Sequence, residues 1–114
     1  MTSDIISIKD CVDLDIEEEF VFVLAPFKEE RTKIYNEIIK PTVEKDGKGF
    51  ICKRADEVKT NTVKLNDIIR NIWKSKFIIA DITELNPNVM YELGFSHAMN
   101  KEVIMICEEK NSNV

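Results

Sequence analysis

The chain has 114 residues and a mass of 13.2 kDa, with 44% hydrophobic and 32% charged residues, which suits one compact domain and leaves little room for a second. Sixteen Lys and Arg residues against 21 Asp and Glu residues give a net charge of −5, so we do not expect the positive surface that holds nucleic-acid phosphates. One His and three widely spaced Cys residues argue against a metal site and a disulfide framework.

The longest apolar run covers residues 20–27 and is far shorter than the roughly 20 residues that a membrane helix needs. Met1 is followed by polar residues instead of the basic and apolar segments of a secretion signal. We therefore expect a soluble, cytoplasmic protein that does not enter a membrane.

Residues 1–19 show no helical or strand period and include an acidic run at 13–19, so we interpret them as an N-terminal arm or linker before a domain at 20–114. Residues 20–25 are continuously apolar, with β-branched and aromatic side chains, which is typical of a strand buried on both faces. Pro26 ends this strand.

A helix is expected next, because apolar residues recur every three or four positions between residues 34 and 43, and the pattern stops at Gly47. Pro41 lies inside the pattern and lacks a backbone N–H, so the helix should kink or split there. The shorter and more polar stretch 49–53 predicts a strand at the border of a sheet.

A second helix, at residues 65–73, has one apolar face, and Asn61 or Thr62 would cap its start. Residues 77–81 predict the third strand. The dipeptide Asn86-Pro87 then marks a helix start, because Asn caps free amides and Pro needs no donor at the first helical position.

This third helix should extend to about residue 100, with Val89, Leu93 and His97 on its buried side. A Gly inside a helix costs roughly 1 kcal/mol relative to Ala, so we expect Gly94 to lie where a strand approaches closely. Residues 103–107 predict a last strand that is fully buried.

Strands that alternate with helices predict an α/β fold, a doubly wound parallel sheet that helices cover on both faces, and we expect the strand order 2-1-3-4. Only residues 108–114 follow the last strand. We therefore expect a final helix and strand to come from further residues or from a partner chain.

In such a sheet, ligands bind outside the carboxyl ends of the strands, where the strand order reverses. The loop after the first strand, with Pro26 and Phe27, should then face residues 81–88. This loop has no Gly, which excludes the dinucleotide fingerprint and the phosphate-binding loop of NTPases.

Carboxylates are the chemical groups that we expect at this cleft. We expect Asp81, Glu92 and Asp56 to converge there, with neutral hydrogen-bonding groups on Asn86, Asn88 and Tyr91. Carboxylates stabilise the cation that forms when a glycosidic bond breaks, so this set favours cleavage of a sugar bond without a metal or a redox cofactor.

One segment, Asp81-Ile-Thr-Glu-Leu-Asn-Pro-Asn-Val-Met-Tyr-Glu-Leu-Gly94, followed by His97-Ala98 and Lys101, resembles the nucleoside 2-deoxyribosyltransferase-like and TIR-like nucleotide-binding superfamily. The stretches 22–27, 38–41 and 54–56 resemble its bacterial TIR-like branch, which is often met in antiphage proteins. The similarity covers roughly residues 20–107, and Asn-Pro-Asn-Val-x-Tyr-Glu-Leu-Gly is its most specific part.

The resemblance implies a flavodoxin-like fold in which Glu92 is the catalytic carboxylate at the anomeric carbon and Asp81 binds sugar hydroxyls. Deoxyribosyltransferases carry an acid six residues before the nucleophile, and Asn86 holds that position here. Hydrolysis of NAD or a related nucleotide, or binding alone, therefore fits better than base exchange. Members of this family often act only when assembled, so the resemblance also implies a homo-oligomer.

Several candidates have a purely structural alternative. Asp81 could cap the loop after its strand, Asn86 could be only a helix cap, and Phe27 could be a core residue instead of a stacking platform for a base. Three hypotheses follow: an N-glycosidase for NAD or a related nucleotide, a nucleotide-sensing module without chemistry, and a structural fragment whose site is completed elsewhere.

Overall fold

A computed structural model describes residues 15–46, 49–58 and 65–109 of the chain. The strands are β1 (Phe20–Leu24), β2 (Ile51–Arg54), β3 (Phe77–Asp81) and β4 (Val103–Ile106). The helices are α2 (Glu29–Ile34), the π-helical turn η2 (Tyr35–Ile39), α3 (Lys40–Asp46), α4 (Ala55–Val58), α5 (Leu65–Lys74) and α6 (Pro87–Ala98).

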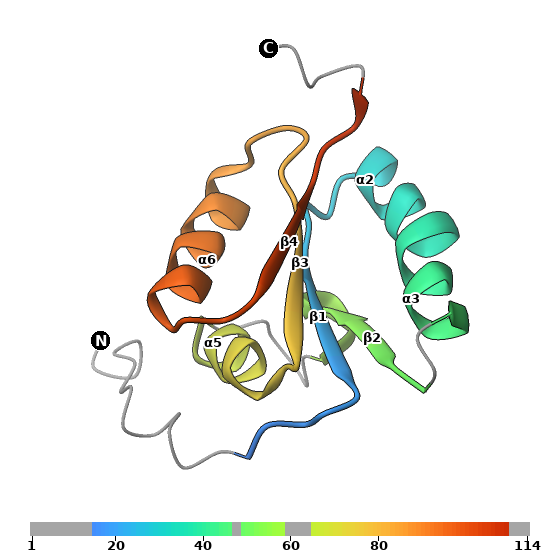
Figure 1. The fold of residues 1–114 in the computed structure, drawn as a ribbon. Helices are drawn as coiled ribbons and strands as arrows, with labels where there is room; N and C mark the ends of the chain where they lie inside the picture. Colours follow the sequence, from blue (N-terminus) through green and yellow to red (C-terminus); the bar gives the residue numbers. More distant parts are fainter. Residues whose placement is uncertain (1–14, 47–48, 59–64, 110–114) are drawn as a thin grey trace.

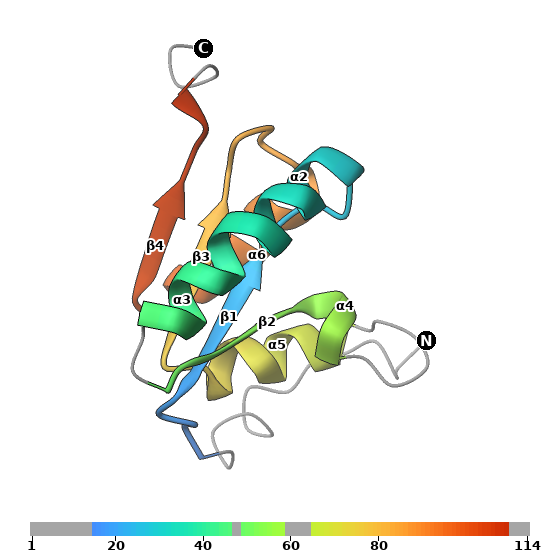
Figure 2. The same ribbon diagram turned by 90° about the vertical axis from the view of Figure 1, so that its right-hand side faces the viewer.

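The four strands form one parallel sheet in the order β2-β1-β3-β4, as predicted. Figure 2 shows β4 at one border of the sheet and β2 at the other, with β1 and β3 between them. The strand order reverses between β1 and β3, so the switch point of the sheet lies where the sequence predicted it.

Helices cover both faces of the sheet (Figure 1), with α5 and α6 on one side and α2 and α3 on the other. The alternation of side chains along β1 explains the two layers, because Phe20, Phe22 and Leu24 join the core under α5 and α6. Val21 and Val23 point the other way and join the core under η2. Each face of β1 is therefore buried, which accounts for its uninterrupted apolar sequence.

The irregularity that Pro41 predicts takes the form of a π-helical turn that ends two residues before the proline. In η2, the N–H of Lys40 bonds to the carbonyl of Tyr35, five residues earlier. A proline ring clashes with the carbonyl four residues before it in a regular α-helix, and a wider turn relieves this clash. The helical segment therefore continues through Pro41 to Asp46 without a break.

The prediction that the last strand is fully buried is wrong. β4 pairs with β3 alone, and the exposed fractions of Ile104 and Met105 are 48% and 52%. A run of apolar residues can belong to a central strand or to a border strand whose apolar side chains are exposed. The sequence alone does not distinguish these two cases.

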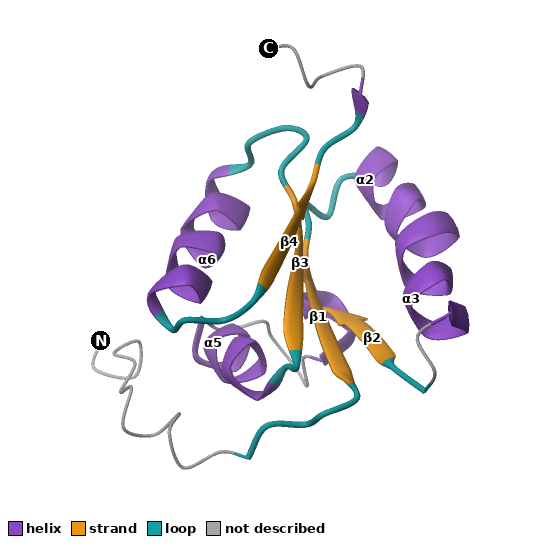
Figure 3. Ribbon diagram, in the orientation of Figure 1, coloured by secondary structure: helices purple, strands orange, loops and turns teal. Residues whose placement is uncertain are grey.

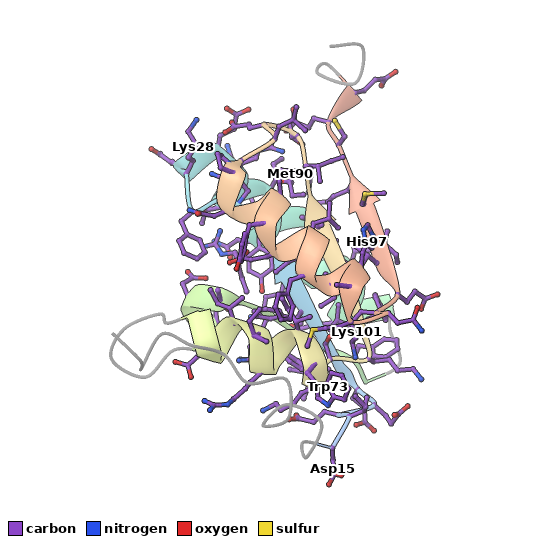
Figure 4. All side chains as sticks on the ribbon, turned by 90° about the vertical axis from the view of Figure 1, so that its left-hand side faces the viewer. Asp15, Lys28, Trp73, Met90, His97 and Lys101 are labelled. Atoms are coloured by element: carbon purple, nitrogen blue, oxygen red, sulfur yellow. The ribbon has the colours of Figure 1, made fainter. Side chains whose placement is uncertain are left out.

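Two predictions for α6 are also wrong. His97 is exposed, and its place on the inner side is taken by Ser96, which is buried with Val89 and Leu93. Gly94 is exposed too, and a Cβ built on it would meet no atom within 4 Å. Figure 4 shows Met90 and His97 on the outward side of this helix. No strand approaches Gly94 closely in the described part of the molecule.

The segment before β1 contacts the body of the domain, because the N–H of Glu17 bonds to the carbonyl of Lys74 at 2.8 Å. The short helix α4 was not predicted, and the expected caps Asn61 and Thr62 lie outside the described residues. None of the helices that the structure describes has the length and apolar character to cross a bilayer.

Candidate functional site

A pocket of about 300 Å³ lies beside the carboxyl end of β1, on the side of the sheet that carries α5 and α6. The loops that leave β1 and β3 flank this end of the sheet (Figure 3). The pocket is lined by Val23, Leu24, Ala25, Pro26 and Phe27, by Ala55 and Ile68, and by Asn86, Asn88, Val89 and Glu92. Its lining is therefore mostly apolar, with a few polar groups from the start of α6, which is the usual composition of a small-molecule site.

Glu92 is the only ionisable side chain among the described residues that line the pocket. It lies in the second turn of α6, next to Leu93, which faces the core. Burial raises the pKa of Glu92 to about 7, because a desolvated carboxylate is less stable than the neutral acid. No hydrogen bond or ion pair to its carboxyl group is found within the described ranges. This carboxyl group is therefore partly protonated near neutral pH and available to a ligand.

Asn86 lies at the rim of the pocket and caps helix α6. Its Oδ1 accepts hydrogen bonds from the N–H groups of Asn88 and Val89, at 2.9 and 3.1 Å, so it is the N-cap of α6. The capping role leaves the Nδ2 amino group as a donor for a ligand. The sequence analysis treated a helix cap and a ligand contact as alternatives for Asn86, and the observed geometry is compatible with both.

Arg54 holds the loop that contributes Pro26 and Phe27. Its guanidinium carbon lies 4.8 Å from the centre of the Phe27 ring, and its Nη1 donates to the carbonyl of Pro26 at 3.3 Å. The same atom donates to Oγ1 of Thr32 at 2.8 Å. Phe27 lines the pocket and is 55% exposed. The guanidinium group of Arg54 therefore packs against the ring, and more than half of the side chain remains accessible.

Asp56 does not line the pocket. Its carboxylate receives two hydrogen bonds from Arg54, from Nε and Nη2, each at 2.8 Å. This bidentate pair neutralises and orients the guanidinium that supports Phe27. Asp56 is therefore linked to the pocket through Arg54, which contacts the lining residue Phe27.

Asp81 also lies outside the pocket lining, and its exposed fraction is 1%. Its carboxylate accepts hydrogen bonds from Nη1 of Arg31, at 3.1 Å to the nearer oxygen, and from the backbone N–H and Oγ1 of Thr83. Arg31 also pairs with Glu108, beyond β4. Asp81 therefore joins α2, the end of β3 and the segment after β4, and the three expected carboxylates do not meet in one cleft.

Tyr91 is not among the residues that line the pocket and is 59% exposed, although it is the neighbour of Glu92. A salt bridge between Lys28 and Glu84, at 3.0 Å, joins the loops after β1 and β3. Across the described ranges, no three His, Cys, Asp or Glu side chains come together in a way that could hold a metal ion.

Arg31 and Arg54 are the structural residues of this region that the sequence did not reveal. Arg31 stands in the highly charged stretch Glu29-Glu-Arg-Thr-Lys33, which reads as a solvated helix face, yet its exposed fraction is 1%. For Arg54 the sequence held one signal of its structural role: Asp56, two residues later at the end of a strand, can form a bidentate pair with it.

Comparison with solved structures finds a 2-desoxiribosyltransferase from Leishmania mexicana with a TM-score of 0.57 and 20% sequence identity. The match covers 78% of this chain and 64% of that enzyme chain. No protein-family model matches the sequence, and no curated protein matches it. The resemblance that the sequence suggested is therefore confirmed for the fold, which is nucleoside deoxyribosyltransferase-like.

Proposed function

We propose that this domain cleaves the N-glycosidic bond of a nucleoside or nucleotide, with the Glu92 carboxylate facing the anomeric carbon. The observation that carries the proposal is a single desolvated carboxyl group, with a pKa of about 7, in a pocket at the switch point of the sheet. The structurally similar chain is described as a 2-desoxiribosyltransferase, an enzyme that acts on the same kind of bond.

The chemistry of the step follows from the charge that develops. The bond between C1′ and the base nitrogen breaks, its electron pair leaves with the base, and C1′ becomes cationic. An ionised Glu92 carboxylate in an apolar pocket stabilises this cation more strongly than it would in water. Water then adds to C1′ and releases a proton, so the products are the free base and the sugar.

Two features of the lining bear on the substrate. Because the described lining supplies one carboxyl group, no second acid is available to protonate the leaving base, which favours bases that depart neutral, such as the nicotinamide of NAD. The same lining residues include no Lys or Arg, which disfavours an anchor for phosphate. Nicotinamide riboside satisfies both conditions, so we expect it to react better than NAD.

Hydrolysis is favoured over base exchange by the position of Asn86. In the deoxyribosyltransferases that the sequence resembles this position is an acid, whereas here Asn86 caps α6 with its Oδ1. The second candidate function is ligand sensing without chemistry. The observation that favours it is the presence of one carboxylate in the described lining, where sugar-cleaving sites usually have a pair.

The direct experiment is product analysis. The protein is incubated with NAD, nicotinamide riboside, adenosine, inosine and their 2′-deoxy forms, with and without a second base, and released base is measured by chromatography. We expect base release that falls by about 10²- to 10⁴-fold in Glu92→Gln. Glu37→Gln is the matched control, because Glu37 is exposed in η2 and does not line the pocket.

Each result has a distinct meaning. Base release by the wild type and the control, but not by Glu92→Gln, supports the proposal, and transfer to the second base would replace hydrolysis by exchange. Equal rates in all three proteins would remove Glu92 from the mechanism. Thermal stabilisation by a nucleoside without any product would favour the sensing function.

A further inference from the structure

A buried arginine packs against the aromatic ring that Phe27 contributes to the pocket. The guanidinium carbon of Arg54 lies 4.8 Å from the centre of this ring, and Arg54 itself is not among the lining residues. The exposed fraction of Arg54 is 4%, so solvent does little to weaken the field of its charge. One wall of the pocket is therefore an aromatic ring with a cationic group close to it, outside the pocket.

Hydrogen bonds on several sides hold this guanidinium group in place. Its Nη1 donates to the carbonyl of Pro26 and to Oγ1 of Thr32, at 3.3 and 2.8 Å. Its Nε and Nη2 donate to the two carboxylate oxygens of Asp56, each at 2.8 Å. Such a bidentate pair fixes the plane of the guanidinium group as well as its position. Arg54 therefore supports the ring of Phe27, and Asp56 cancels the charge of the group that supports it.

The charge near this wall matters for the base that would stack on it. Every nucleobase has a π-face, and an aromatic side chain that is 55% exposed in a pocket offers a surface for stacking. The proposed function favours bases that depart neutral, and such a base is positively charged while it is bonded to C1′. Stacked on Phe27, it would lie within roughly 10 Å of the guanidinium group. An uncompensated Arg54 would therefore repel the expected substrate.

We propose that the pair of Arg54 and Asp56 adapts the Phe27 wall to a positively charged base. Arg54 is a positioning residue that holds the ring, and Asp56 is a specificity-determining residue that removes the repulsion between the guanidinium group and a cationic base. This inference rests on the proposed function, because it takes the pocket to hold a nucleoside with its base against Phe27. A pair that served only the folded structure would affect charged and neutral ligands alike.

Oxidised and reduced nicotinamide riboside are matched probes of this charge effect, because the oxidised base is a cation and the reduced base is a neutral ring of similar size. Their dissociation constants are measured by calorimetry at low ionic strength, on the full chain with Glu92→Gln so that turnover does not interfere. We expect Asp56→Asn to weaken the binding of the oxidised form about three- to tenfold more than that of the reduced form. Added salt should reduce this difference.

Glu18→Gln is the matched control, because Glu18 also forms an ion pair, with Lys76 at 2.9 Å, but precedes β1 and does not line the pocket. This variant changes the net charge equally and should leave the ratio of the two dissociation constants unchanged. The double variant Arg54→Met/Asp56→Asn removes both charges and should restore the ratio of the parent protein, although both forms bind more weakly. Phe27→Leu should weaken the binding of both forms about tenfold or more, because stacking is lost.

The outcomes separate this inference from the proposed function. An unchanged ratio in Asp56→Asn, the same change in Glu18→Gln, or no binding of either form overturns the inference. If base release depends on Glu92 but the ratio does not move, the proposed catalysis stands and the role of Asp56 is wrong. If the ratio moves as expected but the wild type releases no base, the role of Asp56 stands and the catalysis is wrong. Should the double variant not fold, the comparison of Asp56→Asn with Glu18→Gln still decides.

Discussion

At the scale of single residues, the presence or absence of a positively charged partner distinguishes the three candidate carboxylates. Glu92 is desolvated without a partner in the described ranges, so its charged form is destabilised. Asp81 and Asp56 are compensated by guanidinium groups, those of Arg31 and Arg54. Residue type and spacing placed all three in one cleft, and the arrangement of their neighbours in the structure separates them.

Glu92 predicts an unusual pH dependence of stability. Its pKa is about 7 in the folded state against an ordinary value of 4.5, so the folded protein keeps this proton where the unfolded chain has lost it. Its contribution to stability therefore falls as the pH rises from about 4.5 to about 7. At pH 8, Glu92→Gln should raise the free energy of unfolding by on the order of 2 kcal/mol.

Urea denaturation at pH 5 and pH 8 checks this prediction. The difference in the free energy of unfolding between Glu92→Gln and wild type should be small at pH 5 and clearly positive at pH 8. Glu37→Gln serves as the control, and a constant difference at the two pH values would show that Glu92 is not desolvated in the folded protein.

The buried pair of Arg31 and Asp81 predicts a large and asymmetric mutational effect. Each side chain is 1% exposed, and Nη1 of Arg31 lies 3.1 Å from Oδ2 of Asp81. Removal of one partner of a buried pair typically costs about 3–5 kcal/mol, whereas an apolar replacement of both is much milder. Asp81→Leu should therefore destabilise the protein more than the double variant Arg31→Met/Asp81→Leu.

Thermal or urea unfolding of the single and double variants measures this coupling as a double-mutant cycle. Additive effects would mean that the two charges do not depend on each other. A nucleoside cleavage assay on the same variants separates the roles, because a substrate-binding Asp81 would lower activity beyond the loss of folded protein.

At the scale of elements, helix α6 shows where sequence patterns succeed and where they fail. Its start at Pro87 was predicted, because Asn86 and Pro87 carry a local signal that does not depend on tertiary contacts. The expected packing of Gly94 was wrong, because exposure depends on the rotation of the helix against the sheet. The burial of β4 was also mispredicted, because an apolar sequence does not reveal whether another strand pairs with its outer edge.

Gly94 gives a direct test at this scale. Because it lies inside a helix, with open space around the position of a Cβ, Gly94→Ala should raise the free energy of unfolding by about 0.5–1 kcal/mol. Chemical denaturation of the monomer checks it. Destabilisation by this substitution would indicate that another surface approaches α6 at this position.

At the scale of the whole molecule, the composition of β1 and of β2 predicted where each of these two strands lies in the sheet. The uninterrupted apolar sequence of β1 predicted a central strand, and the polar character of β2 predicted a border strand, as observed. The parallel sheet and the position of the switch point followed from the alternation of strands and helices. The buried pair of Arg31 and Asp81 could not be predicted, because the two residues are 50 positions apart in sequence.

Hydrogen exchange tests this architecture as a whole. Amides of β1 and β3 are hydrogen-bonded between two strands and covered on both faces, so they should exchange most slowly. Amides of β2 and β4 should exchange faster in the monomer. Slowest exchange at a border strand in dilute protein would contradict the observed strand order.

The central claim is that the carboxyl group of Glu92 is a desolvated, ligand-facing acid. A ¹³C NMR titration of the side-chain carboxyl groups, with the Glu92 signal assigned by comparison with Glu92→Gln, measures it most directly. We predict a midpoint near pH 7 and a signal that shifts when nicotinamide riboside is added. A midpoint near the ordinary value of 4.5, and a signal that the nucleoside leaves unchanged, would contradict the account.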